Sequence, residues 1–292
     1  MRKRAPYKAR SLIMTLHLLV LSGCSLLMPE EITRMQERTS TAARHLEDAH
    51  PEWFHTYEVD GRTMHFVEVV SPQPKPLVIF IHGSPGDWRG WTDYLTDETL
   101  TAKAHLIAVD RPGFGNSGAG KVERSLAQQS KDVAPLLDRV QKGQRVILVG
   151  HSYGGPLAAR MAIDYPKKVT DVIILAGSID PALEETKWYQ YPADWRLIRW
   201  AVPSVLTVTN QEIMALKDEL TTMLPLWVNI RQRVTVIQGG KDDLVPAANA
   251  DFAQEKLVNA ASLSMIRLPE NNHFLPWNQT ALVKETIVKH LR

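Results

Sequence analysis

Ser152 has the surroundings of an activated nucleophile. It is the central residue of the G-x-S-x-G pattern at 150–154, which follows an apolar, β-branched run at 146–149 and precedes a segment with helical spacing. The two glycines remove Cβ atoms where a strand and a helix crowd together, so a strained turn can project the serine side chain. The pattern therefore predicts a strand, a sharp turn carrying a nucleophile, and a helix.

Asp242 and His273 are the candidate acid and base. Asp242 follows the predicted strand 234–237 and stands three residues before Val245-Pro246, and His273 follows the predicted strand 263–268. Because parallel strands end at the same edge of a sheet, the carboxylate is well placed to orient the histidine.

Two backbone N–H groups are candidates for binding a negative oxygen. Tyr153 follows the nucleophile at the start of the predicted helix, where backbone donors and the helix dipole favour an anion. Ser84 follows the buried run 77–81, in the turn His82-Gly83-Ser84-Pro85-Gly86. We expect both N–H groups to point to the space beside Ser152. The glycine-rich turn 110–117 has neither GxGxxG nor a P-loop lysine, and we interpret it as structural.

The remaining pattern predicts an α/β fold with an insertion. A hairpin is expected at 53–70 around Asp60-Gly61, then strands at 106–109 and 169–175, with an amphipathic helix at 126–140 between them. The alternation breaks at 179–230, which we interpret as a helical cap with helices at 193–202 and 211–224. Four tryptophans in the cap are candidates for an apolar substrate pocket or, alternatively, for packing the cap onto the sheet: Trp188, Trp195, Trp200 and Trp227.

The first residues have the pattern of an export signal. Five basic residues and no acidic one precede a short apolar run, and the segment 1–23 ends in Leu21-Ser22-Gly23 before Cys24. This resembles a bacterial lipobox, which implies cleavage before Cys24 and lipidation of that residue, the only cysteine. Ser25 follows, which by the lipoprotein sorting rule implies the outer membrane, facing the periplasm. Residues 24–52 are expected to be a spacer and 53–292 the domain.

Charge and composition exclude several classes of function. Removal of 1–23 leaves 29 basic and 32 acidic residues, a net charge of −3 without a basic patch for nucleic acid. No Cys/His cluster has metal-ligand spacing, and no cofactor is expected. With a single cysteine, no disulfide can form within the chain.

Five motifs in order resemble those of the α/β-hydrolases, over residues 60–292. Three of the motifs are described above: the elbow, the His82 turn and the His273-Phe274 turn. The other two are Asp110 to Ser117, which is similar to D-x-P-G-x-G-x-S, and Asp242 to Pro246, which is similar to D-x-x-V-P. The resemblance implies a mostly parallel sheet with helices on both faces. It also implies a triad in which Ser152 attacks, His273 acts as base and then acid, and Asp242 fixes the imidazole tautomer. Members with aspartate at the elbow, such as epoxide hydrolases, are excluded by Ser152.

Three functions remain open from the sequence. The first is hydrolysis of a carboxylic ester of a small apolar substrate, favoured by the aromatic cap. The second is an aminopeptidase, because His82 to Gly86 is similar to the HGxPG turn of proline iminopeptidases and Glu184, Glu185 or Asp194 would receive a substrate amine. The third is a lipoprotein interaction module, against which the complete set of catalytic residues argues. The expected partners are thus a small ester or peptide and a membrane, with the oligomeric state open.

Overall fold

The computed structural model describes residues 30–71, 73–141, 143–195, 199–200 and 202–292. The predicted signal peptide and Cys24 lie outside the described residues. Within these residues, eight strands form one sheet in the order β1-β2-β4-β3-β5-β6-β7-β8, in which β2 alone runs against its neighbours. The strands are β1 (Phe54–Val59), β2 (Arg62–Val69), β3 (Leu77–Ile81), β4 (His105–Val109), β5 (Val146–His151), β6 (Asp171–Leu175), β7 (Arg233–Gly239) and β8 (Ser262–Leu268).

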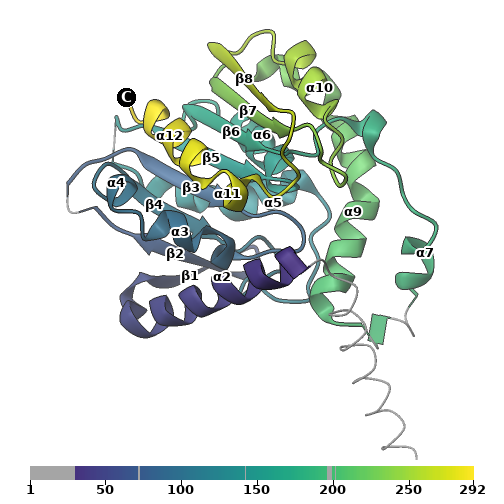
Figure 1. Ribbon diagram of the computed structural model, residues 1–292, viewed down its shortest axis with the longest axis horizontal. Helices are drawn as coiled ribbons and strands as arrows, with labels where there is room; N and C mark the ends of the chain where they lie inside the picture. Colours follow the sequence, from purple (N-terminus) through teal and green to yellow (C-terminus); the bar gives the residue numbers. More distant parts are fainter. Residues whose placement is uncertain (1–29, 72, 142, 196–198, 201) are drawn as a thin grey trace, which may run out of the picture.

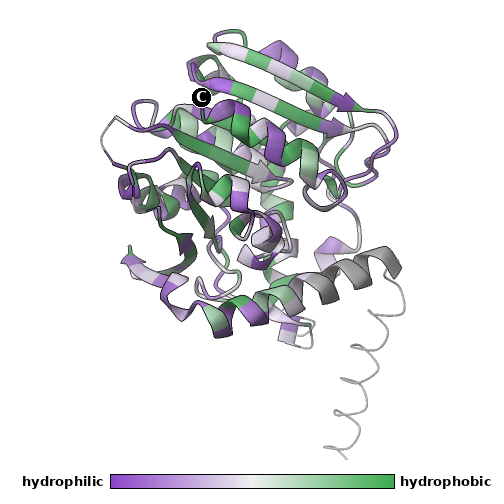
Figure 2. Ribbon diagram, turned by 60° about the vertical axis from the view of Figure 1, so that its left-hand side comes forward, coloured by the Kyte–Doolittle hydropathy of each residue, from purple (hydrophilic) through white to green (hydrophobic). Residues whose placement is uncertain are grey.

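Helices cover both faces of this sheet (Figure 1). Successive residues of β3 point to opposite faces of the sheet. Leu77, Ile79 and Ile81 belong to the hydrophobic cluster on one face, and Val78 and Phe80 belong to the cluster on the other. The central strands are apolar along their length (Figure 2), as expected for a parallel sheet covered on both sides. The α-helices are α2 (Glu30–Ala49), α3 (Thr92–Leu95), α4 (Glu98–Thr101), α5 (Leu126–Val133), α6 (Gly154–Asp164), α7 (Gln190–Ala193), α9 (Ser204–Met223), α10 (Asn249–Lys256), α11 (Leu275–Asn278) and α12 (Thr280–His290). Short 3₁₀ helices are η1 (Pro51–Trp53), η2 (Trp88–Trp91), η3 (Ala134–Arg139), η4 (Pro181–Leu183) and η5 (Leu224–Asn229).

The sheet topology determines where a site can form. β3 lies between β4 and β5 in the sheet. The chain therefore adds β4 on one side of β3 and β5 on the other, and the strand order reverses at this point. The loops after β3 and β5 therefore lie next to each other at the carboxyl edge, the place where open α/β sheets bind ligands. The predicted hairpin is present, with Asp60 and Gly61 at φ +48° and +75° in the turn between β1 and β2.

Helix α2 occupies most of the expected spacer, and its last turns pack on the domain. Ala43 and Leu46 are buried in the cluster that contains Trp91, and Glu47 accepts a hydrogen bond from the Arg89 guanidinium at 3.0 Å. The folded unit thus includes residues that the sequence assigned to the spacer. Among the described residues, no helix has the length and hydropathy of a membrane span.

Three predicted helices have different bounds in the structure. The helix expected at 126–140 ends at Val133 and continues as η3, because Pro135 has no N–H and disfavours a longer helix. In the expected cap, the α-helix α7 ends at Ala193, where the predicted 193–202 begins; residues 196–198 and 201 of that range lie outside the described residues. The predicted 211–224 is the second part of α9, which begins at Ser204.

Candidate active site

Ser152 sits in a strained turn at the carboxyl end of β5. Its φ is +53°, a left-handed conformation that residues other than glycine rarely adopt. Its N–H donates to the Leu175 carbonyl of β6 at 3.0 Å, and its own carbonyl accepts from Gly155 at 2.9 Å. A Cβ on Gly154 would lie 2.3 Å from the Ile81 carbonyl oxygen, so only glycine lets α6 approach β3 this closely. The sequence thus builds the sharp strand-turn-helix that the pattern predicted.

Asp242 and His273 form a buried pair. Asp242 follows β7 and His273 follows β8, and the His273 Nδ1–H donates to the Asp242 Oδ2 at 2.8 Å. The other oxygen of Asp242 accepts from the N–H groups of Leu244 and Val245 at 3.0 and 2.7 Å. The carboxylate is therefore held by its own turn, and it directs the His273 Nε2 away from itself as the free ring nitrogen.

The loop of His273 is joined to the elbow. The His151 Nε2–H donates to the His273 backbone carbonyl at 3.0 Å, and the two imidazole rings are 4.8 Å apart. Burial, with His273 as neighbour, lowers the pKa of His151 well below its usual value, so His151 is neutral at neutral pH. Within the described structure, no hydrogen bond joins the Ser152 hydroxyl to His273. A substrate-free serine and its base often lie further apart than a hydrogen bond.

The turn after β3 lies against the nucleophile. A Cβ on Gly83 would be 2.8 Å from the Ser152 Cβ, which places the neighbouring Ser84 at the same edge of the sheet. Neither the Ser84 nor the Tyr153 N–H donates to another group in the described part of the chain. Both donors are thus available, and their role in binding an incoming oxygen stays a prediction.

Comparison with known proteins adds the family context. A family profile described as alpha/beta hydrolase fold matches residues 76–209, which span β3, the elbow and the start of the insertion. The solved structure of a membrane phospholipase A is similar over 97% of this chain and 99% of that chain, with a TM-score of 0.61 at 18% identity. The thioesterase domain from the curacin biosynthetic pathway covers 81% of this chain and 98% of its own length, with a TM-score of 0.62 and 18% identity. The chain has the α/β-hydrolase fold.

The sequence relatives of this chain are named for different activities. The dihydrolipoyllysine-residue acetyltransferase component of the acetoin cleaving system of Pseudomonas putida is 28% identical over 80% of this chain and 68% of its own length. The human mitochondrial palmitoyl-protein thioesterase ABHD10 is 30% identical over 59% of this chain. The bifunctional epoxide hydrolase 2 of Sus scrofa is 36% identical over 42%. The chain spans 58% and 21% of the length of the last two relatives, respectively.

Arg111 is a residue of this candidate site that the sequence interpretation missed. It is fully buried, and its guanidinium donates to the carbonyl oxygens of His82 and Gly83 at 2.9 and 3.0 Å. It also forms a two-pronged ion pair with Glu212 of α9, at 2.8 and 2.9 Å, and lies 4.4 Å from the centre of the Tyr153 ring. Arg111 thus joins the turn after β3, the elbow and the insertion. One feature of the sequence could have indicated a buried ion pair: Glu212 lies at helical spacing between Val208 and Leu216, on the buried side of α9.

His82 is held neutral by the same network. Its Nδ1–H donates to the Gly83 carbonyl at 2.7 Å, while its Nε2 accepts from the Arg111 backbone N–H at 2.9 Å. Burial, and then the Arg111 charge, lower the pKa of His82 to about 3. A proton on Nε2 would face the Arg111 N–H, so this ring is a structural member of its turn.

The four candidate tryptophans have different environments. Trp227 is fully buried and packs edge-on against Phe252 of α10, in the core beneath the sheet. Its assignment as a substrate contact is wrong, because a side chain with no exposed surface in that core cannot meet a ligand; packing is its role. Trp188, Trp195 and Trp200 are instead 80%, 65% and 74% exposed, and substrate contact by them stays a prediction.

The acidic residues proposed to receive a substrate amine already have partners. Glu185 is exposed and pairs with Lys187 at 2.7 Å, and Asp194 accepts from the Gln211 amide at 2.6 Å. Glu184 accepts from the hydroxyl of Ser178, whose N–H donates to the Ser152 carbonyl at 3.4 Å. Burial raises the pKa of Glu184, which weakens it as a partner for a cation.

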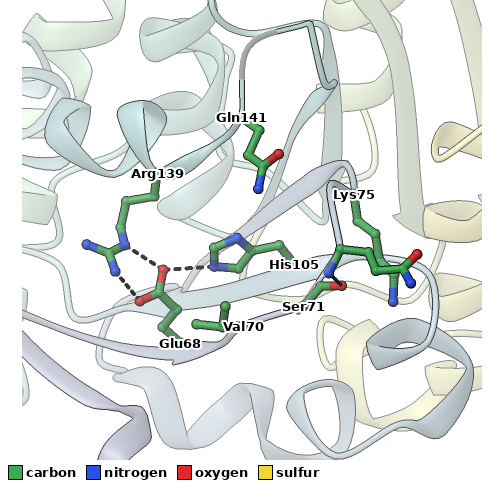
Figure 3. A pocket seen from close by; sticks show the side chains of 8 residues that line it. Glu68, Val70, Ser71, Lys75, His105, Arg139 and Gln141 are labelled. Atoms are coloured by element: carbon green, nitrogen blue, oxygen red, sulfur yellow. Dashed lines mark hydrogen bonds and ion pairs between the residues drawn. The ribbon is translucent and has the colours of Figure 1, made fainter.

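A polar cavity of about 210 Å³ lies elsewhere on the protein (Figure 3). Its lining includes Glu68, His105 and Arg139, and Glu68 accepts hydrogen bonds from both of the others. His105 is the first residue of β4, whereas the elbow follows the last residues of β5. The cavity is therefore at the opposite edge of the sheet from Ser152. Glu68, His105 and Arg139 are paired with one another there, and Lys75 donates to the Thr101 carbonyl at 3.4 Å. Among the described residues, no group of three or more potential ligands could hold a metal ion.

Proposed function

We propose that this chain is a serine hydrolase that cleaves a carboxylic ester through an acyl-Ser152 intermediate. The observation that carries the proposal is the left-handed Ser152 at the strand-helix turn, at the same sheet edge as the buried Asp242–His273 pair. This is the arrangement that activates a serine for acyl transfer.

The chemistry follows from the positions of the hydrogens. The Ser152 oxygen attacks the ester carbonyl carbon while the His273 Nε2 takes its proton, and Asp242 stabilises the resulting imidazolium. The negative oxygen of the tetrahedral intermediate accepts hydrogen bonds from the N–H groups of Ser84 and Tyr153. The His273 proton then goes to the leaving alcohol. A water molecule, deprotonated by His273, releases the acid and restores Ser152.

Relatives support an acyl substrate rather than an epoxide. The palmitoyl-protein thioesterase and the phospholipase are named for the cleavage of acyl bonds, whereas the epoxide hydrolase matches only 42% of the chain. The resemblance implies aspartate at the elbow of epoxide hydrolases, and this chain has Ser152. We therefore propose an apolar acyl or alcohol group as the substrate. The aminopeptidase alternative is disfavoured by the partners of Glu184, Glu185 and Asp194.

We further propose that the domain is exported and lipid-anchored. The support is the basic, then apolar, segment that ends at the sole cysteine, Cys24, and the Ser25 that follows it. Several acyl chains on one residue would attach the protein stably. The proposed location is the outer membrane, facing the periplasm.

Labelling and a substrate panel test the enzyme proposal. A fluorophosphonate should label the purified chain but not Ser152→Ala, and p-nitrophenyl esters should be turned over faster than proline-naphthylamide. The matched control is Ser178→Ala, which removes a neighbouring hydroxyl and should leave the label in place. Equal labelling of the parent chain and Ser152→Ala would contradict the proposal, and absence of label from the folded parent would favour an interaction module.

A further inference from the structure

Exposed aromatic side chains gather on one segment of the insertion. The described residues include eleven exposed large hydrophobic side chains, and seven of them lie between residues 188 and 206. Five of the seven are aromatic, with 57–80% of their surface exposed; we call them the aromatic surface: Trp188, Tyr189, Tyr191, Trp195 and Trp200. At 150–250 Å² per ring, they expose on the order of 600 Å². This total is at the upper end of the largest apolar patch on a typical monomer, and such patches are often binding sites.

The chemistry of this surface fits the headgroup region of a bilayer. Tryptophan and tyrosine combine an apolar ring with one polar atom, and they concentrate where a membrane meets water. The charges beside them pair with one another, Glu185 with Lys187 at 2.7 Å and Asp194 with Arg199 at 3.7 Å. Over 185–200 the sequence has three basic and two acidic residues, so the segment offers rings with a net charge of only +1, which is compatible with a zwitterionic lipid surface.

The position of the N-terminus gives the direction from which a membrane would approach. Figure 1 shows the N-terminal end of α2, which begins at Glu30, on the same side of the molecule as α7 and the start of α9. Cys24, the proposed lipid-anchored residue, precedes Glu30 by six residues, which reach at most about 20 Å when fully extended. A membrane that holds Cys24 would thus face the side of the molecule that carries the aromatic surface.

We propose that the aromatic surface docks on a phospholipid bilayer, as a second contact beside the anchor. The docking needs no turnover by Ser152, although it rests on the proposed anchor for its direction. It would hold the insertion against the membrane on the same side as Cys24. Lipid-derived esters, whose acyl chains are apolar, would then be the nearest substrates.

Lipid quenching of tryptophan fluorescence tests this contact. All eight tryptophans lie after residue 29, and Trp88, Trp91 and Trp227 are buried. The full-length chain in vesicles of dibrominated phosphatidylcholine should be quenched relative to vesicles of unbrominated lipid. In the triple variant Trp188→Phe/Trp195→Phe/Trp200→Phe the quenching should fall roughly threefold or more, because bromine quenches only rings in contact with lipid. The melting temperature should stay that of the parent, since all three side chains are exposed.

The controls separate docking from anchoring and from catalysis. Trp53→Phe, at the other end of α2, should keep the parental quenching, and so should Ser152→Ala. If the chain sediments with vesicles but brominated lipid does not quench it, or if the triple variant is quenched like the parent, docking is refuted while the anchor stands. If instead iodide in water fails to quench these rings and light scattering shows a dimer, the surface joins two copies of the chain and the proposal is overturned.

Discussion

Ser152 carries the backbone strain of this site. A residue other than glycine at φ +53° costs on the order of 1–3 kcal/mol, and hydrogen bonds to Leu175 and Gly155 hold it in place. The same conformation turns the side chain away from the strand and leaves the Tyr153 N–H free. The left-handed conformation of Ser152 therefore accounts both for its backbone strain and for the exposure of its side chain.

Removal of single members of the proposed triad should be non-additive. Ser152→Ala and His273→Ala are each expected to lower kcat by roughly 10⁵- to 10⁶-fold, and the double variant should be little worse, because the residues act as one unit. Ester hydrolysis by purified variants measures this. Losses that multiply in the double variant would show that the two residues act independently.

Asp242 and the adjacent Asp243 form a matched pair of variants. Asp242→Asn should cost on the order of 10⁴-fold in kcat, because an amide in that place favours the wrong tautomer of His273. Asp243 is exposed, and Asp243→Asn should have a far smaller effect. The same assay measures both variants. A larger loss of kcat in Asp243→Asn than in Asp242→Asn would identify Asp243 as the acid of the triad.

The buried His82 predicts a loss of stability in mild acid. Its pKa is about 3 in the folded chain against about 6.5 when unfolded, so the unfolded chain binds the proton more tightly. This stability is fully present above pH 6.5 and is lost as the pH falls from 6.5 toward 3, by about 1.4 kcal/mol per unit. Between pH 6.5 and pH 5, His82 alone should remove about 2 kcal/mol.

Urea unfolding at several pH values measures that slope. His82→Gln should flatten it, whereas His50→Gln, at a half-exposed histidine near the end of α2, should not. If His82→Gln retained the parental slope, His82 would not be the group that titrates.

At the scale of elements, α9 is joined to the catalytic edge. Glu212 holds Arg111, whose guanidinium holds the carbonyls of His82 and Gly83, and the Ser84 hydroxyl donates to Thr209 of α9 at 3.2 Å. The insertion thus supports the turn after β3, which carries the proposed oxyanion donor Ser84. A change in α9 should therefore alter chemistry and stability together.

Breaking the Arg111–Glu212 pair tests this link. Glu212→Gln should destabilise the fold by about 3–5 kcal/mol, because it leaves a buried guanidinium without its counter-charge. Arg111→Met/Glu212→Leu should recover part of that stability but not kcat, since the carbonyls of His82 and Gly83 both lose the hydrogen bond from Arg111. Thermal unfolding and ester turnover measure the two effects, with the exposed Asp218→Asn of the same helix as control. A double variant with parental kcat would show that Arg111 does not position the turn.

Two tryptophans of the insertion should respond oppositely to truncation. Trp227→Ala should cost about 3–5 kcal/mol of unfolding free energy, because it empties a site in the core beside Phe252. Trp195→Ala, at a side chain that is 65% exposed, should change stability by less than about 0.5 kcal/mol. Urea unfolding compares them, and similar losses would place Trp195 in a packed contact.

The central strands β3 to β7 were predictable to within about two residues because burial on both faces makes them continuous apolar runs. The run 77–81 is β3, and the run 146–149 lies within β5. Asp242 was predictable because it follows the buried strand β7, and His273 because it follows β8, an edge strand with alternating apolar residues. The Arg111–Glu212 pair was not, since the partners are 101 residues apart and neither strand nor turn chemistry relates them. Trp227 and Trp195 have the same side chain, so only the tertiary structure separates the buried residue from the exposed one.

At the scale of the whole molecule, Cys24 should decide where the protein is found. The parent is expected in the membrane fraction, and Cys24→Ser should accumulate as unprocessed or soluble precursor, because the cleavage and lipidation both require that cysteine. Cell fractionation with a size comparison measures this. Maturation of Cys24→Ser to the parental size and fraction would remove the anchor from the proposal.

The packing of α2 also has a consequence for the release of the domain by proteolysis. Because Ala43 and Leu46 are buried in the cluster that contains Trp91 and Glu47 bonds to Arg89, the last turns of α2 are part of the protected core. A protease acting on the folded protein should therefore leave a fragment that begins before Ala43. A cut after Leu46 would detach a piece of the core itself, so shedding from the membrane and loss of the fold are separated by only a few residues of one helix.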